Sequence, residues 1–454
     1  MMLDLHPQEI YLNYKNNHFS KENTLVKLKM IIENSKISKY RIESMEIIYN
    51  LGITNGETFH FMENILLSDS IENMRNLAAL IIGKYFFHSA LKPMSWAFYH
   101  EDSPTCLKTI YNYLIKLLKD NVTLKDPSKR ILLINELEKI QEPEYKVEVD
   151  ILKEKETFRR LSTRNIANIL INYFTINYLK KVYWRISYDL EKFNIKKIDF
   201  KFQSLNTIPL PLKNLENLEI LTLRFNQIKK VPLWINKLKD LRELNLNVNE
   251  IHKLPESIIK LSKLEKLSLW KNKLTKLPTK IGKLQNLRIL NLRLNKIDNL
   301  PASIGTLYNL IDLNLHDNKL RNVPKTIGNL NELNDLNLSW NELDNLPEEI
   351  GNLANLERLD LGRNELSFLP SSIGNLKSLK YLDLSENNLI FLPKKFQLLQ
   401  NLEFLNLSRN KFEKVPEILI KLENLKELYL DYDLIEQKSY ILTKLFDLNI
   451  KINR

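Results

Sequence analysis

The chain has 454 residues, of which 44% are hydrophobic and 27% are charged, and its formal net charge is +12. This balance is typical of a globular protein and excludes a largely disordered chain. The single cysteine, Cys106, excludes an intramolecular disulfide. Apolar runs such as 77–82 are far shorter than the roughly 20 residues that cross a bilayer, and the first residues lack a signal-peptide pattern. We therefore expect a cytoplasmic protein without a transmembrane segment.

Residues 1–194 are predicted to form an all-α domain. Apolar residues recur at helical spacing in 37–51, 71–87, 106–118 and 166–179. A weaker repeat accompanies them, because the interval from Arg41 to Arg75 is almost the same as the interval from Asp69 to Asp102. Two interpretations stay open. The region contains HEAT-like repeats, which stack helix pairs into an array, or it is an ordinary helical bundle whose spacing is coincidental.

Residues 195–435 are dominated by a repeat whose period does not vary. From Leu218 onward the pattern LxxLxLxxNxL occurs in nine consecutive coils, and a tenth coil has Asp433 at the asparagine position. The segments between read LPxxIGxL, as in 277–284. Self-similarity at a fixed period indicates a solenoid, in which each unit buries its apolar face against its neighbours. The leading leucines are Leu218, Leu241, Leu264, Leu287, Leu310, Leu333, Leu356, Leu379, Leu402 and Leu425.

This pattern resembles the leucine-rich-repeat family, and the consensus LPxxIGxLxxLxxLxLxxNxL is similar to that of its intracellular Ras-suppressor and Scribble type. The resemblance covers roughly residues 195–435 and implies a horseshoe lined by a parallel β-sheet. The predicted fold is therefore an α/β leucine-rich-repeat solenoid of about eleven coils, preceded by an all-α helical-repeat domain. Residues 436–454 are predicted to form a C-terminal cap.

Elementary geometry assigns a role to each repeated position. Side chains alternate along a strand, so Leu221 and Leu223 are expected to point inward, and Thr222 and Arg224 outward. The recurrent asparagine is expected to turn inward and bond backbone groups of adjacent coils. The glycine that follows isoleucine is expected to relieve a tight backbone position.

The outward strand positions supply the candidate partner site. Tryptophan, tyrosine and arginine are enriched at binding hot spots, so Trp270, Arg293, His316 and Trp340 are predicted to form its centre. The alternative is a solvated strand face with incidental aromatic residues. The complete predicted partner-binding set is Arg224, Trp270, Arg293, His316, Trp340, Tyr381, Phe404 and Tyr429.

No enzymatic chemistry is predicted. The nine glycines form neither GxxxxGK(S/T) nor GxGxxG, and the seven histidines form no HExxH. Cys106 has no local catalytic signature. We therefore expect no catalytic residue, no metal ion and no cofactor.

The predicted function is that of a scaffold or adaptor that binds a protein on its concave face. The resemblance to the Ras-suppressor type implies a small GTPase as a candidate partner, in signal transduction. The alternative is a nucleic-acid or anionic membrane-surface binder that uses the lysine-rich early repeats. These lysines fall on several faces of the coil, which argues against nucleic acid. They are Lys260, Lys263, Lys266, Lys271, Lys273, Lys276, Lys280 and Lys283.

Overall fold

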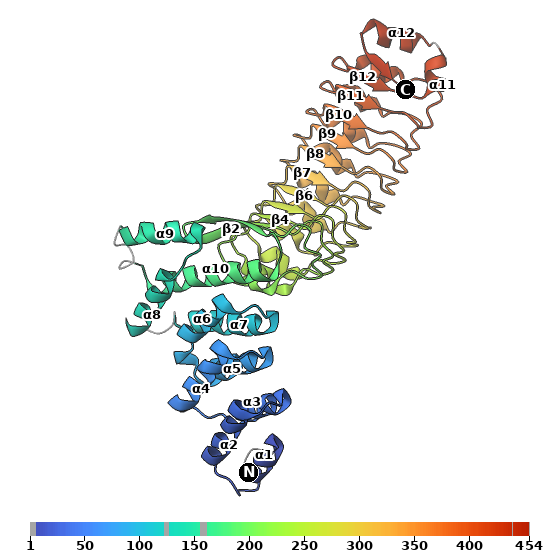
Figure 1. Ribbon diagram of the computed structural model, residues 1–454. Coiled ribbons are helices and arrows are strands. Elements are labelled where there is room, and N and C mark those ends of the chain that lie inside the picture. The colour runs from blue at the N-terminus through green and yellow to red at the C-terminus, as the bar shows by residue number, and fades with distance from the viewer. Residues whose placement is uncertain (1–5, 122–126, 155–160, 438, 454) are drawn as a thin grey trace. The chain divides into compact units, whose positions relative to one another are not determined.

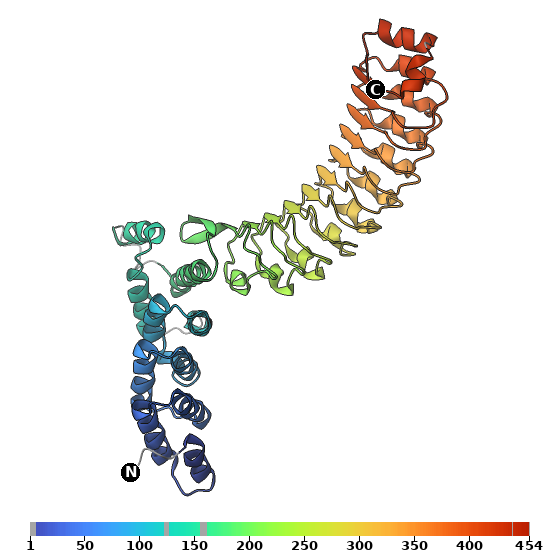
Figure 2. The same ribbon diagram turned by 45° about the vertical axis from the view of Figure 1, so that its right-hand side comes forward.

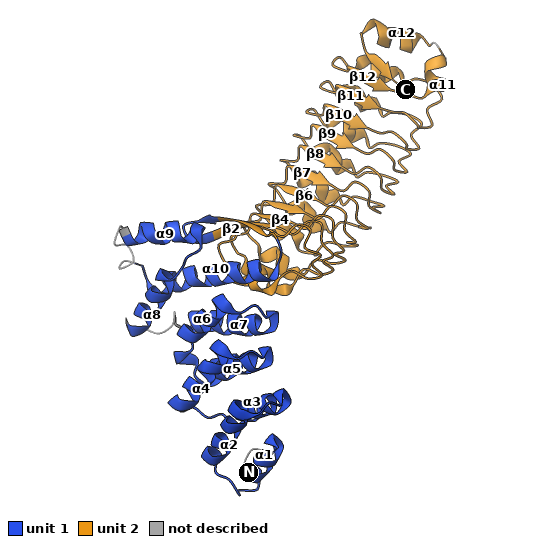
Figure 3. Ribbon diagram, in the orientation of Figure 1, with its two compact units in different colours: residues 1–184, 190–194 blue, residues 185–189, 195–454 orange. Residues whose placement is uncertain are grey.

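The computed structural model describes residues 6–121, 127–154, 161–437 and 439–453. The chain divides into two compact units, shown in different colours in Figure 3. The first comprises residues 1–184 and 190–194, and the second comprises 185–189 and 195–454. None of the helices in the described ranges is long and apolar enough to cross a lipid bilayer.

The first unit is built from α-helices (Figure 1). Three consecutive pairs, α2 with α3, α4 with α5, and α6 with α7, pack within each pair, and α3, α5 and α7 also pack on one another in turn. The helices are α1 Pro7–Lys15, α2 Lys21–Asn34, α3 Ser38–Leu51, α4 Gly56–Ser68, α5 Glu72–Tyr85, α6 Leu91–His100, α7 Pro104–Asn121, α8 Pro127–Glu138, α9 Pro143–Glu154 and α10 Thr163–Val182, with a short 3₁₀ turn, η1, at Phe87–Ser89.

Two arginines at equivalent positions tie successive helices together. Arg41 in α3 bonds Asp69, which follows α4, and its Nε donates to the Ile32 carbonyl at 2.7 Å. One helix pair later, Arg75 in α5 makes two hydrogen bonds of 2.8 Å to the carboxylate of Glu101, which follows α6. The spacing of the two arginines in the sequence therefore has a structural cause. Each joins the second helix of its own pair to the segment that follows the first helix of the next pair.

The second unit is a solenoid whose strands form one sheet in chain order. From β2 to β13 the pairing is parallel, and each residue pairs with the one a single repeat away, as Leu221 does with Leu244. Figure 2 shows these strands along the inner edge of the curved unit. The strands are β1 Ser187–Glu191, β2 Asn194–Asp199, β3 Ile220–Thr222, β4 Glu243–Asn245, β5 Lys266–Ser268, β6 Ile289–Asn291, β7 Asp312–Asn314, β8 Asp335–Asn337, β9 Arg358–Asp360, β10 Tyr381–Asp383, β11 Phe404–Asn406, β12 Glu427–Tyr429 and β13 Lys451–Asn453.

The convex side carries a short 3₁₀ turn in each of these coils. A proline, whose φ is fixed, directly precedes every turn except η6, which follows Lys280. A leucine core fills the space between turn and strand, and Leu221 and Leu223 are fully buried, as predicted. The turns are η3 Leu210–Asn214, η4 Leu233–Lys237, η5 Glu256–Lys260, η6 Ile281–Lys283, η7 Ala302–Thr306, η8 Lys325–Asn329, η9 Glu348–Asn352, η10 Ser371–Asn375, η11 Lys394–Leu398 and η12 Glu417–Lys421.

The repeated asparagine joins neighbouring coils, which confirms its predicted role. In Asn318 the side-chain oxygen accepts the Ile297 N–H at 3.0 Å. The amide group donates to the carbonyls of Leu292 at 3.0 Å and Leu315 at 2.9 Å. Ile297 and Leu292 belong to the preceding coil, so each asparagine satisfies buried backbone groups of two coils at once.

The residue directly before each asparagine has a left-handed backbone. From Phe225 to Arg409 this turn position has φ between 53° and 58°, and it is never glycine in these nine coils. The residues there include Val248, Asp317 and Trp340. Non-glycine residues pay on the order of 1–3 kcal/mol for such a conformation, so the surrounding hydrogen bonds must hold it.

The glycines after isoleucine sit where the next coil comes closest. At Gly305 an added Cβ would clash with the carbonyl oxygen of Thr326 in the following coil. The predicted tight position is confirmed, and its cause is close packing between turns of adjacent coils. Beyond β12 the chain forms α11 Tyr432–Glu436 and α12 Tyr440–Asp447, and then β13 extends the sheet by one more strand.

Candidate functional site on the concave face

The outer face of the sheet carries three columns of side chains, each with one residue per coil. The parallel register places these residues side by side across the strands. The first column runs from Ile220 through Asp312, Asp335, Arg358, Tyr381 and Phe404. The second runs from Thr222 through Asn314, Asn337, Asp360, Asp383 and Tyr429. The third, just past the strand ends, runs from Arg224 through Trp270, Arg293, His316, Ser339, Gly362 and Ser385.

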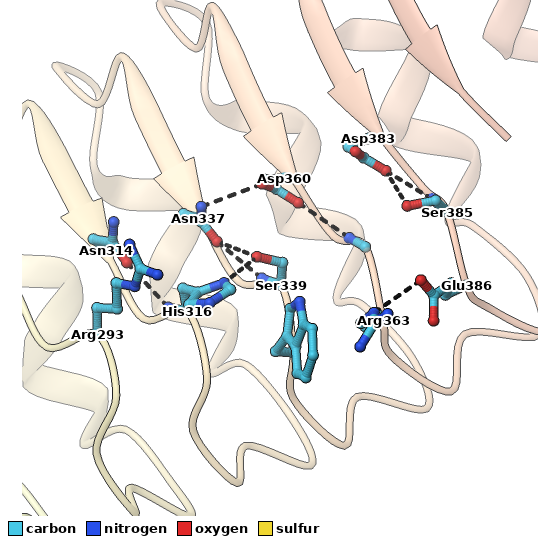
Figure 4. Close-up of a pocket in the computed structure, with 12 residues that line it drawn as sticks. Arg293, Asn314, His316, Asn337, Ser339, Asp360, Arg363, Asp383, Ser385 and Glu386 are labelled. Carbon is cyan, nitrogen blue, oxygen red and sulfur yellow. Dashed lines mark hydrogen bonds and ion pairs between the residues drawn. The ribbon is translucent and has the colours of Figure 1, made fainter. Parts of the chain in front are cut away.

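A pocket of about 250 Å³ opens on this face across the coils of β6 to β10. Its floor comes from the second and third columns, and the turn residues Trp340, Arg363 and Glu386 complete its rim. Figure 4 shows Arg293 at one end of the group and Asp383 at the other. Gly362 supplies no side chain at the centre of the third column. An added Cβ there would lie 3.1 Å from Ser385 Oγ, so the missing side chain helps to keep the pocket open.

A chain of hydrogen bonds crosses the pocket floor from β7 to β9 (Figure 4). Ser339 Oγ donates to Asn337 Oδ1 at 2.6 Å, and Asn337 Nδ2 donates to Asp360 Oδ2 at 3.2 Å. Because the serine proton is used in this way, His316 Nδ1 must donate to Ser339 Oγ, at 2.8 Å. This bond fixes the tautomer and leaves His316 Nε2 as an acceptor. Burial, and then the charge of Arg293, lower the pKa of His316, which favours the neutral ring.

An aromatic ring, that of Trp340, forms part of the pocket rim. Trp340 is 46% exposed, and the Arg363 guanidinium lies 3.8 Å from the centre of its ring. Arg363 is held in turn by Glu386, at 2.8 Å. A cation over an aromatic face is attracted by the ring quadrupole, so the two side chains stabilise each other's orientation.

The pocket has opposite charges at its two ends. Arg293 is exposed at one end. At the other end lie Asp360 and Asp383, which belong to adjacent strands. Burial, and then the neighbouring charge of Asp383, raise the pKa of Asp360. The arrangement can therefore receive a polar group by both hydrogen bonds and charge, with the Trp340 ring as an apolar contact.

The structure separates the predicted partner-binding residues into three groups. Arg293, His316 and Trp340 line the pocket. Tyr381, Phe404 and Tyr429 form a row of rings, in which Tyr381 stacks on Phe404 at 4.3 Å and Phe404 lies 5.4 Å from Tyr429. The Arg358 guanidinium covers the other face of Tyr381 at 3.5 Å.

The remaining two predicted residues, Arg224 and Trp270, lie on the earlier coils and do not line this pocket. Both are half-buried, and the Arg224 Nε and Trp270 Nε1 atoms are inaccessible and have no hydrogen-bond partner among the described residues. The sequence predicts Trp270 at the centre of the site together with Trp340. The structure places the two tryptophans three coils apart.

Sequence reasoning does not single out Gly362, Arg363, Asp360 or Glu386. One signal is available, because Gly362 is the one glycine in the third column. The positions of Arg363 and Glu386 cannot be read from strand alternation, because both occupy the left-handed turn beyond the strands.

We searched the described ranges for side chains that hold a metal ion or act as a nucleophile. No set of three or more histidine, cysteine, aspartate or glutamate side chains in these ranges is placed to hold a metal ion. Cys106 is buried in α7, and burial raises the pKa of its thiol, which makes it a poor nucleophile.

Three family models match the solenoid. A leucine-rich repeat region matches residues 265–341, a leucine rich repeat model matches 216–274 and 343–389, and a second repeat model matches 401–422. With the parallel sheet and the helices before it, they identify the chain as a leucine-rich-repeat protein with an N-terminal helical region. The predicted fold class is confirmed. Such proteins generally mediate protein binding and are usually non-catalytic, and no catalytic domain is detected in the chain.

Among solved structures, the chain is similar to a leucine-rich-repeat protein of Leptospira interrogans, with 28% identity over 56% of this chain and 83% of that one and a TM-score of 0.35. It is also similar to a TDR receptor, with 28% identity over 52% of this chain and 42% of the receptor and a TM-score of 0.48. An internalin of Listeria monocytogenes is 22% identical over 57% of this chain and 82% of the internalin, with a TM-score of 0.44. No curated protein matches the chain.

Proposed function

We propose that the chain is a non-catalytic scaffold or adaptor that binds a protein partner on its concave face, centred on the pocket between β6 and β10. The observation that carries the proposal is the pocket itself. It combines an exposed aromatic ring, an exposed guanidinium and half-buried carboxylates on a rigid sheet. Tryptophan and arginine are the residue types that dominate the energy of protein interfaces.

The size of the pocket supports a protein partner over a free small molecule. Small-molecule sites usually enclose about 300–1,000 Å³. The present pocket, at about 250 Å³, suits a single side chain of a larger partner. The row of rings formed by Tyr381, Phe404 and Tyr429 continues along the same face, so a partner that fills the pocket can also cover these rings.

A matched pair of tryptophans tests the proposal. Trp340 at the pocket and Trp96 in α6 are both 46% exposed, so both are equally available for truncation. A partner is first isolated by affinity capture and mass spectrometry, and its affinity is then measured by calorimetry. Trp340→Ala should weaken binding about tenfold or more, the range of an interface hot spot, whereas Trp96→Ala should leave it unchanged. Equal affinity for wild type and Trp340→Ala would contradict the placement. The affinity of Trp270→Ala for the same partner shows whether the contact extends to the earlier coils.

The class of partner and its setting are further parts of this proposal. The likeness of the consensus to Ras-suppressor-type repeats supports a small GTPase and a role in signalling. The single cysteine supports a cytoplasmic location. A pull-down with the small GTPases of the same organism tests this partner class. If the chain retains none of them, the small-GTPase proposal is wrong.

The helical unit is proposed to consist of HEAT-like repeats. The support is the pair of equivalent contacts that Arg41 and Arg75 make, one helix pair apart. The alternative drawn from the lysine-rich early coils is a nucleic-acid or anionic-membrane contact. These lysines lie on several faces, because Lys266 is in the first column of the concave face and Lys283 ends a convex turn.

A further inference from the structure

The early coils carry six exposed lysines in two columns on the convex side. Lys230, Lys253 and Lys276 precede the 3₁₀ turns of three successive coils, and backbone bridging between Lys230 and Lys253 keeps neighbours in register. Lys237, Lys260 and Lys283 are the last residues of η4, η5 and η6. We call these six residues the lysine patch.

Within the described ranges, the six lysines of the patch have no acidic partner, unlike three other lysines of the same coils. Lys263 pairs with Asp240 at 2.6 Å, and Lys273 pairs with Glu250 at 2.9 Å. For the six patch lysines, no carboxylate among the described residues lies within 4 Å. Like charges stacked in register repel one another, so the patch concentrates positive charge. The exposed Glu256, itself a described residue, lies between Lys253 and Lys260 along the chain, but it forms no ion pair with the patch lysines.

The fold does not require lysine at these positions. In the next coils the first column continues as Asn299, Asn322 and Asn345, and the second as Thr306, Asn329 and Asn352. These neutral residues occupy equivalent places in coils with the same register. The two columns carry lysine again in the last coil, at Lys414 and Lys421. Three consecutive lysines in each column occur in the early coils alone, and this concentration of charge calls for an external explanation.

Exposed aliphatic residues lie beside the lysines. Leu233, at the start of η4, is 74% exposed, and Leu210, at the equivalent start of η3, is 52% exposed. Leu233 stands between Lys230 and Lys237 along the chain. A nucleic-acid phosphate backbone would use the lysines but would gain nothing from aliphatic side chains, because its readers use stacking rings instead. A lipid surface uses both features.

We propose that the convex side of the coils of β2 to β5 docks on an anionic membrane surface. The lysine patch contacts the acidic headgroups, and Leu210 and Leu233 enter the boundary between headgroups and acyl chains. The outward columns of the sheet lie on the other side of the coil, so the concave face stays free while the convex side is docked.

Vesicle binding of the full chain tests this assignment. The probe is a phosphatidylcholine vesicle with or without phosphatidylserine, and binding is measured by co-sedimentation over a range of salt concentrations. The wild-type chain should bind the phosphatidylserine vesicles and lose binding as salt rises. Lys230→Asn, Lys253→Asn and Lys276→Asn together copy the residue that later coils carry. They should weaken binding about fivefold per lysine, on the order of 100-fold in total.

A matched control separates the patch from net charge. Lys394→Asn, Lys414→Asn and Lys421→Asn remove the same charge from exposed sites on the last coils and should leave binding within about twofold. An equal loss in the two triple variants would overturn the proposal, as would a failure of the wild-type chain to bind. Circular dichroism melts confirm that both variants are folded.

Two further arms identify the ligand. Leu210→Thr with Leu233→Thr should weaken vesicle binding several-fold while the salt dependence stays the same. Binding that is unaffected by this double change would overturn insertion of the leucines. A DNA duplex and a single-stranded RNA are titrated at the same salt concentrations. If either binds as tightly as the vesicles and shows the same loss in the lysine variant, the lipid assignment is wrong. Trp340→Ala should bind vesicles like wild type, so the outcome is independent of the concave-face proposal.

Discussion

We call the buried asparagine that recurs once per coil the ladder asparagine. Replacing one of these residues by alanine tests why the repeat requires asparagine there. Asn318 is 7% exposed, and its amide is the hydrogen-bond partner of three buried backbone groups. In Asn318→Ala, the Ile297 N–H loses the one acceptor recorded for it. The carbonyls of Leu292 and Leu315 each lose one hydrogen bond but keep another, because each still accepts a bond from a neighbouring ladder asparagine.

The magnitude follows from these three losses. A buried donor left without a partner costs about 1–3 kcal/mol, and each lost hydrogen bond at a carbonyl that keeps another costs about 0.5–1.5 kcal/mol. We therefore expect Asn318→Ala to lower the free energy of unfolding of the solenoid by roughly 2–6 kcal/mol.

Urea unfolding followed by circular dichroism measures this loss, and the same coil offers a control. Asn309 also bonds a neighbouring coil, through Nδ2 to the Gln285 carbonyl at 2.7 Å, but it is exposed to water. Asn309→Ala should therefore cost less than about 1 kcal/mol. If the two variants were equally stable, burial of the backbone groups would not be the reason for the ladder.

Three other variants probe charges. Arg75→Ala leaves Glu101, which is 5% exposed, buried without its partner, and thermal melts should show a loss of about 3–5 kcal/mol; a loss below about 1 kcal/mol would contradict this. Burial alone would raise the pKa of Glu101, but bonds from Arg75 and from the Ser103 N–H lower it to about 2. Its stabilising effect is thus present above the ordinary value of about 4.3 and is lost as pH falls towards 2, a slope that Glu101→Gln should remove. Burial, and then Asp312, raise the pKa of Asp335 to about 6. The protonated form favours folding, so Asp335→Asn should raise the melting temperature at pH 7.5 and change little near pH 4, and no gain at pH 7.5 would oppose this view.

Much of the solenoid could be predicted from the sequence because its period is invariant. The constant spacing places Leu221 beside Leu244 and every ladder asparagine beside the next, so inward and outward positions follow directly. The helical unit was harder to predict. The interval between Arg41 and Arg75 could be read from the sequence. Their partners could not, because Asp69 and Glu101 lie 28 and 26 residues further on, beyond another helix.

The candidate site could be predicted only in part. Strand alternation identifies the three columns, and it correctly directs Arg293 and His316 outward into one pocket. It says nothing about the curvature of the turns, which bring Trp340 and Arg363 together at 3.8 Å. Strand alternation identifies side chains and not their absence. It therefore does not identify Gly362, although the lack of a side chain there helps to keep the pocket open.

The left-handed turn before each asparagine has an implication for how such a surface can change. Valine, leucine, aspartate, tryptophan, arginine and glutamate all occupy that corner with nearly the same backbone angle. Whatever holds the corner is therefore indifferent to the side chain it carries. Replacing one residue there exchanges an aromatic group for an acidic or a basic one at the edge of the concave face, while the backbone behind it keeps its course.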